Sequence, residues 1–296
     1  MEESQYYRIG GLTIQFQSDL PVGPETFDRR FEKFKTDDTG GDLICIHHHI
    51  GLPVTNYSDL GKRVYDKPPW SIFKNENSWI YLLSQSRELN NDPDRLAIFN
   101  DDYTVGHFYY GDRRALEAQH RPSLTFFPTD QILIAQLMAR RQGVYLHSAA
   151  VNMDGAGLVF VGHSSAGKST TIRLLKDHGE VLCDDRNIVR QESDGFHVYG
   201  TWSHGEIPEV SSTSVPIKAI LFLKKADDNR LVPMADQWDI RLRLLACLIK
   251  PLMTEEWWDK SLDVIEQIVR EVPCYEMWFD KSGAIVPELE KLVKGG

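Results

Sequence analysis

Residues 162–169 read Gly-His-Ser-Ser-Ala-Gly-Lys-Ser and match the phosphate-loop pattern G-x-x-x-x-G-K-[ST] at every fixed position. Glycines let such a loop curl so that successive backbone N–H groups point at an anion, and the following helix adds partial positive charge. We expect Lys168 to reach the terminal phosphates of ATP or another nucleoside triphosphate, and the hydroxyl of Ser169 to bind Mg²⁺. The residues predicted to contact the nucleotide are Gly162, His163, Ser164, Ser165, Ala166, Gly167, Lys168, Ser169 and Thr170.

A pair of carboxylates, Asp184 and Asp185, follows the short apolar run 181–183. On its own such a pair is most often a solvated turn after a strand, but the preceding phosphate loop favours a chemical role. Phosphoryl transfer needs a metal ligand and a group that accepts the proton of the attacking hydroxyl. We therefore predict that one carboxylate binds Mg²⁺ and that the other acts as a base, and the sequence leaves open which does which.

The flanking segments predict the strand and helix that the phosphate loop requires on its two sides. The run 158–161 is rich in residues that favour strands, and 170–176 has the apolar spacing of a helix. A longer strand is predicted at 144–151, with a hairpin turn at 152–155 that leads into the strand before the loop. A further apolar strand is predicted at 217–223.

The two parts of the chain have different patterns. Residues 1–128 carry short β-like runs separated by turn residues, which is typical of an antiparallel meander; we expect a β-rich N-terminal domain that recognises a substrate or peptide. Residues 129–296 mix strands and helices, beginning with a helix over 131–141 that Thr129 or Asp130 would cap. The predicted fold class is α/β, α+β overall, with a domain boundary between 128 and 129.

Three consecutive histidines, His47, His48 and His49, are the one group in the N-terminal half that suggests chemistry. Consecutive residues of a strand point to opposite faces, so at most the outer two could share a metal ion. An exposed or partly packed strand end is the interpretation that this geometry favours over a set of metal ligands.

Composition limits the classes of function. The net charge of −10 and a pI near 5.5 argue against general binding of nucleic acid or membrane surfaces. The four cysteines form no C-x-x-C pair, which argues against a disulfide framework or a cysteine zinc site. The N-terminus lacks the apolar core of a signal peptide, and the sequence has no apolar run long enough to span a bilayer. We expect a cytoplasmic protein.

Three segments in close succession resemble the catalytic domain of HPr kinase/phosphorylase and its relatives. They are Leu146-His147-Ser148-Ala149, the loop 162–170, and Leu182-Cys183-Asp184-Asp185-Arg186. The resemblance covers the chain from about residue 129 and implies a nucleotide fold akin to that of phosphoenolpyruvate carboxykinase. It also implies Asp185 or Asp184 as base, the other as metal ligand or histidine partner, and His147 beside the pair. HPr kinases resemble ring-forming oligomers, so the resemblance also implies that this chain forms a homo-oligomer.

The chain departs from the bifunctional HPr kinase/phosphorylase after the aspartates. The HPr-acting enzymes carry a longer signature there, with a Glu and a Gly-Leu-Gly sequence, which this chain lacks. Glu206 could stand for the acidic residue that assists the metal. The layout is more similar to HPr-kinase-related proteins of peptide-modification gene clusters, including kinases that phosphorylate a serine of a lasso-peptide precursor. That resemblance implies a peptide or small protein as substrate.

The leading hypothesis is an ATP- and Mg²⁺-dependent kinase that phosphorylates a hydroxyl group, with a serine of a peptide or small protein as the favoured acceptor. Phosphoenolpyruvate-carboxykinase-like or small-molecule kinase activity shares the nucleotide chemistry and differs in the acceptor. A third hypothesis is a nucleotide-binding module without catalysis, whose N-terminal half binds a peptide along an edge strand.

Overall fold

The structure is a computed structural model that describes residues 4–53, 60–83, 94–125, 129–251 and 254–295. The chain forms two compact units, Met1–Leu133 and Ile134–Gly296. The division falls inside α2 (Thr129–Ala139), a few residues after the boundary predicted from the sequence. Pro128, which precedes this helix, lies outside the described residues.

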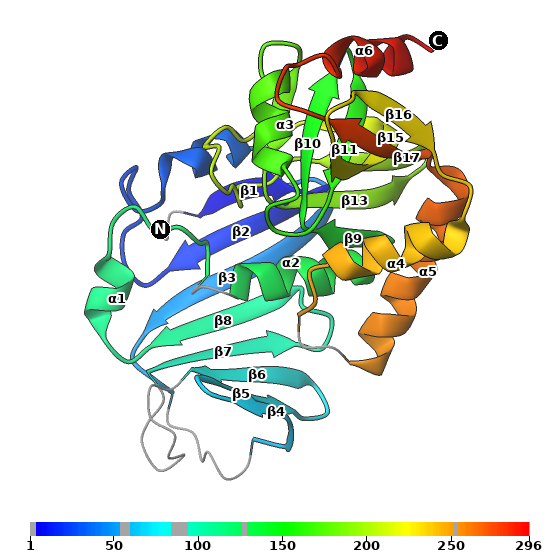
Figure 1. Ribbon diagram of the computed structural model, residues 1–296. Coiled ribbons are helices and arrows are strands. Elements are labelled where there is room, and N and C mark those ends of the chain that lie inside the picture. The colour runs from blue at the N-terminus through cyan, green and yellow to red at the C-terminus, as the bar shows by residue number, and fades with distance from the viewer. Residues whose placement is uncertain (1–3, 54–59, 84–93, 126–128, 252–253, 296) are drawn as a thin grey trace. The chain divides into compact units, whose positions relative to one another are not determined.

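The first unit is built on a single sheet of eight strands in the order β1-β2-β3-β8-β7-β6-β5-β4 (Figure 1). Its elements before α2 are β1 (Gln5–Ile9), β2 (Leu12–Ser18), the 3₁₀-helix η1 (Arg29–Phe34), β3 (Asp42–Ile50), β4 (Lys62–Lys67), β5 (Trp70–Lys74), β6 (Ser78–Leu83), β7 (Arg95–Asn100), β8 (Val105–Tyr110) and α1 (Arg113–Glu117).

The predicted antiparallel meander is correct for β4 to β8 and wrong for β3, which pairs in parallel with both β2 and β8. Parallel neighbours need a crossover connection of a dozen or more residues. The segment 19–41 between β2 and β3 has that length and contains η1, whose Phe31 and Phe34 are buried. The short strands alone did not reveal this crossover.

The second unit holds a sheet of nine strands, with the path β12-β10-β11-β15-β14-β13-β9, with β17 beside β15 and with β16 beside β17. Its elements after α2 are β9 (Gly143–Leu146), β10 (Ser148–Met153), β11 (Ala156–Val161), α3 (Lys168–Leu175), β12 (Glu180–Cys183), β13 (Asn187–Glu192), β14 (Gly195–Tyr199), β15 (Ser214–Lys225), β16 (Arg230–Pro233), α4 (Gln237–Cys247), α5 (Glu255–Glu271), β17 (Cys274–Phe279) and α6 (Val286–Lys294).

Helices cover both faces of this sheet. Ile172 of α3 and Leu289 of α6 pack in one apolar cluster, while Leu244 of α4 and Ile265 of α5 pack in another. Strand β15 pairs in parallel with both β11 and β17 at the centre of the sheet. The central residues of β11 and β15 are buried on both faces, as in most parallel sheets: Val159 and Ile220 pack in one cluster, Phe160 and Leu221 in the other. The arrangement is three layers, helix, sheet and helix, and its strand ends carry the candidate site (Figure 1).

Two details of the second unit differ from the sequence predictions. The single strand predicted at 144–151 is divided into β9 and β10, because the chain changes partners at His147. The side chain of Asp130 lies in the first turn of α2 but accepts the N–H groups of Leu124 and Thr125, both at 2.8 Å, so it ties down the preceding loop. The helix predicted over 131–141 ends at Ala139.

The structure confirms a mixed α/β fold with two sheets. Whether the second unit has the HPr-kinase-like fold stays a prediction. Among the described residues, the structure has no helix with both the length and the apolar character needed to cross a membrane.

The packing of α5 yields a stability test. Ile265 is fully buried against the sheet, whereas Leu262 on the same helix is 37% exposed. We expect Ile265→Ala to lower the free energy of unfolding by about 2–5 kcal/mol, because it leaves a cavity. Leu262→Ala is the matched control and should change it by about 0.5 kcal/mol or less. Urea titrations of both variants measure the difference, and equal losses would contradict this packing.

Candidate functional site

The register of β10 gathers the predicted site residues at one edge of the sheet. Ser148 at the start of β10 pairs with Val161 at the end of β11, and Ala150 pairs with Cys183 at the end of β12. The residues just outside these positions are His147, the loop that begins at Gly162, and Asp184. Residues that are far apart in the sequence therefore meet because of strand pairing.

The break between β9 and β10 is fixed by hydrogen bonds on both sides. The backbone N–H of His147 donates to the carbonyl of Cys247 at 2.7 Å, and that of Ser148 donates to the carbonyl of Asp185 at 3.1 Å. The buried side-chain amide of Asn187 donates to the carbonyls of Ser148 (2.8 Å) and Cys183 (3.2 Å). These bonds hold the backbone of the aspartate pair against the start of β10.

The loop 162–167 is a tight turn between β11 and α3. The N–H of Ala166 donates to the carbonyl of His163 at 3.1 Å, and Ser165 and Gly167 have φ values of +69° and +115°. A Cβ atom on Gly167 would lie 2.7 Å from Cζ of Phe279, so a larger residue meets both backbone strain and a ring. The glycine is required by the shape of the loop itself.

Lys168 is the first residue of α3 and its side chain is buried, 7% exposed. Its Nζ lies 2.8 Å from the carbonyl oxygen of Gly162, 3.2 Å from that of His163 and 2.9 Å from Nε2 of His147. Burial lowers the pKa of the ammonium group, while the carboxylates of Asp184 and Asp185 oppose that shift. An anion in the pocket would stabilise this charge.

His147 connects Lys168 to Asp185. Its Nδ1 lies 3.1 Å from Oδ1 of Asp185 and 3.0 Å from the carbonyl oxygen of the same residue. A neutral imidazole with its proton on Nδ1 satisfies both sides, because Nδ1–H donates to Asp185 and Nε2 accepts from Lys168. The imidazole is thus held as a bridge between cation and carboxylate.

Asp185 is also paired with Arg186, whose Nη1 lies 2.7 Å from Oδ2. Burial raises the pKa of the Asp185 carboxyl, but the hydrogen bond from His147 and the charges of Arg186 and Lys168 outweigh it and lower the pKa overall. The group therefore remains a carboxylate at neutral pH.

Asp184 has different surroundings, although it is the next residue. Its Oδ1 accepts the N–H of Gly205 at 2.6 Å and its Oδ2 accepts that of Ile207 at 2.9 Å, while Oγ of Ser169 lies 3.5 Å from Oδ2. A serine hydroxyl and a carboxylate are hard oxygen donors of the kind that Mg²⁺ prefers, and they fit the predicted metal site. The two aspartates thus face different partners.

These groups line one pocket of about 410 Å³. The predicted residues that line it are His147, Ser164, Ser165, Gly167, Lys168, Ser169, Thr170, Asp184, Asp185 and Glu206. Gly162, His163 and Ala166 shape the loop but do not line the pocket. Glu206 is exposed and forms an ion pair with Arg173 at 2.9 Å, so its role as a metal ligand stays a prediction.

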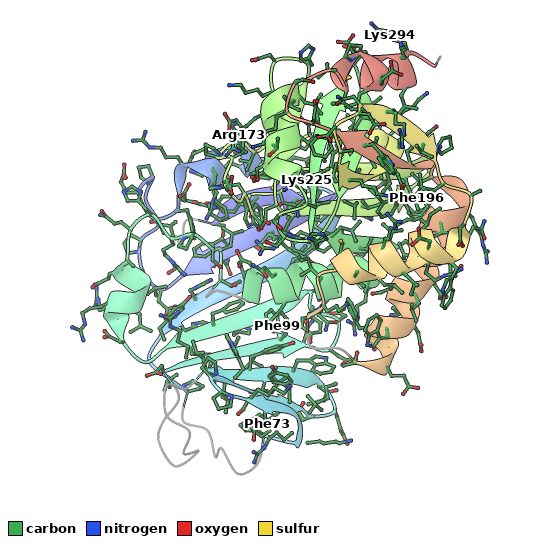
Figure 2. All side chains as sticks on the ribbon, viewed as in Figure 1. Phe73, Phe99, Arg173, Phe196, Lys225 and Lys294 are labelled. Atoms are coloured by element: carbon green, nitrogen blue, oxygen red, sulfur yellow. The ribbon has the colours of Figure 1, made fainter. Side chains whose placement is uncertain are left out.

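Three further residues that line the pocket were not predicted from the sequence: Arg173, Gly205 and Lys225. Figure 2 labels Arg173, on α3, and Lys225, at the end of β15. Because β15 runs parallel to β11, their carboxyl ends lie at the same edge. The strand predicted at 217–223 ended too early to reveal Lys225. Position 173, one turn after Ser169, was a readable signal for Arg173.

Gly167 gives a test of the loop geometry. Gly167→Ala should destabilise the chain through both its positive φ and the contact with Phe279. The matched control is Gly195→Ala, where φ is +127° but no atom lies within 4 Å of the added Cβ, so only the backbone cost of about 1–3 kcal/mol applies. Thermal unfolding should show a larger loss for Gly167→Ala, by about 1–3 kcal/mol for the overpacked ring. Equal losses of stability in the two variants would show that the ring of Phe279 moves aside with no loss of stability.

Asp185 gives a test in pH. Its folded-state pKa is lowered, so the stability that it contributes is present above the unfolded value of about 4 and is lost as pH falls through the folded value. Asp185→Asn should therefore be less stable than the wild-type chain at pH 7, and the gap should narrow below about pH 4. Urea unfolding between neutral and acid pH measures this gap. A gap independent of pH would contradict the hydrogen bond from His147 and the ion pair with Arg186.

Comparisons with known proteins give one family match and one weak structural similarity. A search of curated proteins found no match. A solved structure of the Hpr(Ser) kinase/phosphatase from Coxiella burnetii is similar with a TM-score of 0.32 and 13% sequence identity, over 51% of this chain and 88% of that one. Residues 129–294, more than half of the chain, match the family model of the SynChlorMet cassette protein ScmC. The chain belongs to the ScmC family.

Proposed function

We propose that this protein is an ATP- and Mg²⁺-dependent phosphotransferase that transfers the γ-phosphate to a hydroxyl group. The observation that carries the proposal is the meeting of Lys168, Ser169, Asp184 and the His147–Asp185 pair in one pocket. Phosphoryl transfer needs positive charge at the phosphates, oxygen ligands for a metal ion and a proton acceptor, and these residues supply all three.

On binding ATP, the ammonium of Lys168 would exchange its present contacts with the carbonyls of Gly162 and His163 for phosphate oxygens. Backbone N–H groups at the start of α3 face the same pocket and favour negative charge there. Ser169 and Asp184 would hold Mg²⁺, which when bound neutralises charge on the β- and γ-phosphates. Arg173 and Lys225 add positive charge to the pocket.

Asp185 is the better candidate for the base. The carboxylate of Asp184 is occupied by two backbone N–H groups and lies beside Ser169, whereas that of Asp185 lines the pocket next to His147. The acceptor oxygen would attack the γ-phosphorus, the bond to the β-γ bridging oxygen would break, and the hydroxyl proton would pass to Asp185. Because the transition state is loose, the proton leaves late, so a carboxylate of low pKa suffices. His147 is the positioning residue.

For the acceptor we propose a serine of a peptide or small protein, on the sequence resemblance to HPr-kinase-related proteins of peptide-modification clusters. A cytoplasmic location fits, because ATP is available there and all four cysteines are free thiols.

The test is incubation with γ-labelled ATP, Mg²⁺ and a library of serine-containing peptides, read by mass spectrometry. We expect one phosphate on a serine, with a rate that falls by about 10²–10³-fold in Lys168→Met because a charge that stabilises the transition state is lost. Lys176→Met is the matched control, because this exposed lysine follows the same helix outside the pocket, and it should keep the wild-type rate.

Each other outcome selects another function. Phosphate transfer to a small molecule but to no peptide would indicate a small-molecule kinase. ATP binding without turnover, unchanged by Asp185→Asn, would indicate a nucleotide-binding module. A full transfer rate in Lys168→Met would refute the assigned role of the pocket.

A further inference from the structure

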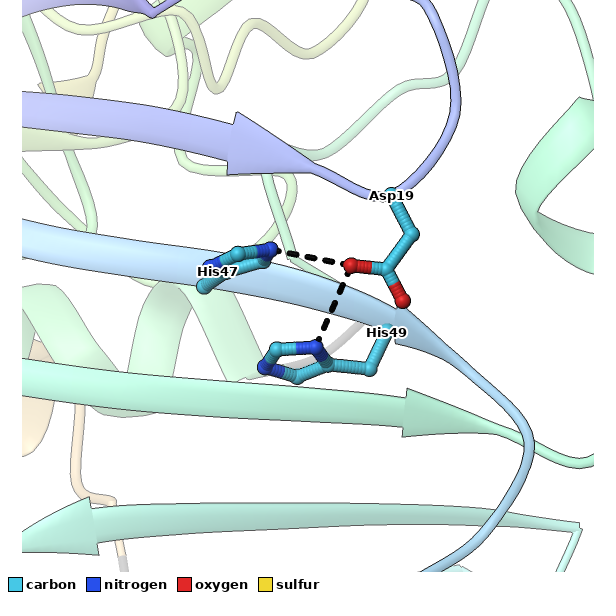
Figure 3. A group of neighbouring side chains, drawn as sticks. All are labelled: Asp19, His47 and His49. Atoms are coloured by element: carbon cyan, nitrogen blue, oxygen red, sulfur yellow. Dashed lines mark hydrogen bonds and ion pairs between the residues drawn. The ribbon is translucent and has the colours of Figure 1, made fainter. Parts of the chain in front are cut away.

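A second cluster of reactive side chains lies in the first unit, beside the end of β2. His47 and His49 of β3 both direct a ring nitrogen at the same oxygen of Asp19, as Figure 3 shows. Nε2 of His47 lies 3.1 Å from Oδ1 of Asp19, and Nδ1 of His49 lies 3.3 Å from it. The three donor atoms lie within 4.8 Å of one another.

Strand geometry explains why these groups converge. His47 and His49 alternate with His48, which points to the opposite face, is fully buried, and bonds through Nδ1 to the hydroxyl of Tyr110 at 2.8 Å. Asp19 directly follows β2, and its N–H donates to the carbonyl of His48 at 2.9 Å. The N–H of Ile50 donates to Oδ2 of Asp19 at 3.0 Å, which turns Oδ1 toward the imidazoles.

We propose that Asp19, His47 and His49 form a binding site for a divalent transition-metal ion of the Zn²⁺ class. Two imidazoles and one carboxylate are a common ligand set for zinc. Ligands about 2.05 Å from a tetrahedral ion stand roughly 3.3 Å apart, close to the separations between Asp19 and the two rings. The fourth position would be left to water or to a group from a binding partner.

His107 contacts one of the proposed ligands, His49, and would fix the orientation of its ring. It lies on β8 (Val105–Tyr110), directly opposite His47 in the strand register, and its Nδ1 is 3.0 Å from Nε2 of His49. A metal-bound histidine usually donates its other ring N–H to an acceptor, which fixes the ring and the tautomer. With His49 bound through Nδ1, its Nε2–H would donate to His107.

Stacking holds the two imidazole rings beside each other. The rings of His47 and His49 are stacked with centroids 4.0 Å apart, and that of His49 is 4.7 Å from the ring of Tyr109.

The alternative is a hydrogen-bonded cluster in which Asp19 accepts from both rings without any metal. Zinc binding separates the two. The full chain, treated with EDTA and then with Zn²⁺ and passed over a desalting column, should retain about one zinc per chain more than Asp19→Asn, His47→Gln or His49→Gln. The matched control is His120→Gln, also a histidine beside a carboxylate in the first unit, 3.2 Å from Glu25, and it should retain the wild-type amount.

Three further measurements test the same site. Zinc should raise the unfolding temperature of the wild-type chain and of His120→Gln but have a smaller effect on the three ligand variants, which also shows that these variants fold. Co²⁺ in place of zinc should give intense visible absorption typical of tetrahedral sites, lost in His49→Gln. His107→Phe should weaken zinc binding by about 10–100-fold, as loss of an outer partner does.

The proposal is overturned if the wild-type chain retains no zinc, or if wild type and the three ligand variants retain equal amounts. Equal retention would place the metal elsewhere, for example at the carboxylates of the second unit. The outcome is independent of phosphotransfer, because none of these residues lines the pocket around Lys168.

Discussion

The charge on Lys168 is the constraint on which the candidate site depends. An ammonium group this deeply buried is costly unless polar partners surround it. The carbonyls of Gly162 and His163 and the imidazole of His147 supply those partners, and Asp185 balances the charge through His147. The same network that makes burial of the lysine tolerable also prepares the pocket for a polyphosphate, which can replace the carbonyls at the ammonium group.

That network exists only because the sheet delivers its members to one edge. β10 is antiparallel to both β11 and β12, so the start of β10 lies beside the ends of its two neighbours. His147 lies between β9 and β10, at the point where the chain changes partner strands. The side chain of Asn187 donates to the carbonyl of Ser148 and so fixes the start of β10. A shift of one residue in this register would carry His147 away from both Lys168 and Asp185.

The histidine cluster of the first unit follows from the same kind of geometry. Strand alternation sends His48 into the core and leaves His47 and His49 beside each other, and the end of β2 brings Asp19 to them. The sequence limited any shared metal to the outer two histidines and favoured a plain strand end. It contained no sign of Asp19, which lies well before them in the chain and reaches them only through the parallel pairing of β2 with β3.

Local sequence determined the loop 162–169, its flanking strand and helix, the hairpin before them and the carboxylates after a buried strand, because each depends on residues close together in the chain. Tertiary structure decided the rest. It placed Asp184 beside Ser169 and Asp185 beside His147, a distinction that two adjacent aspartates do not reveal. It added Lys225, and it made β3 parallel to its neighbours. Pairing between distant strands depends on burial and hydrogen bonding over the whole sheet, and no short stretch of sequence encodes it.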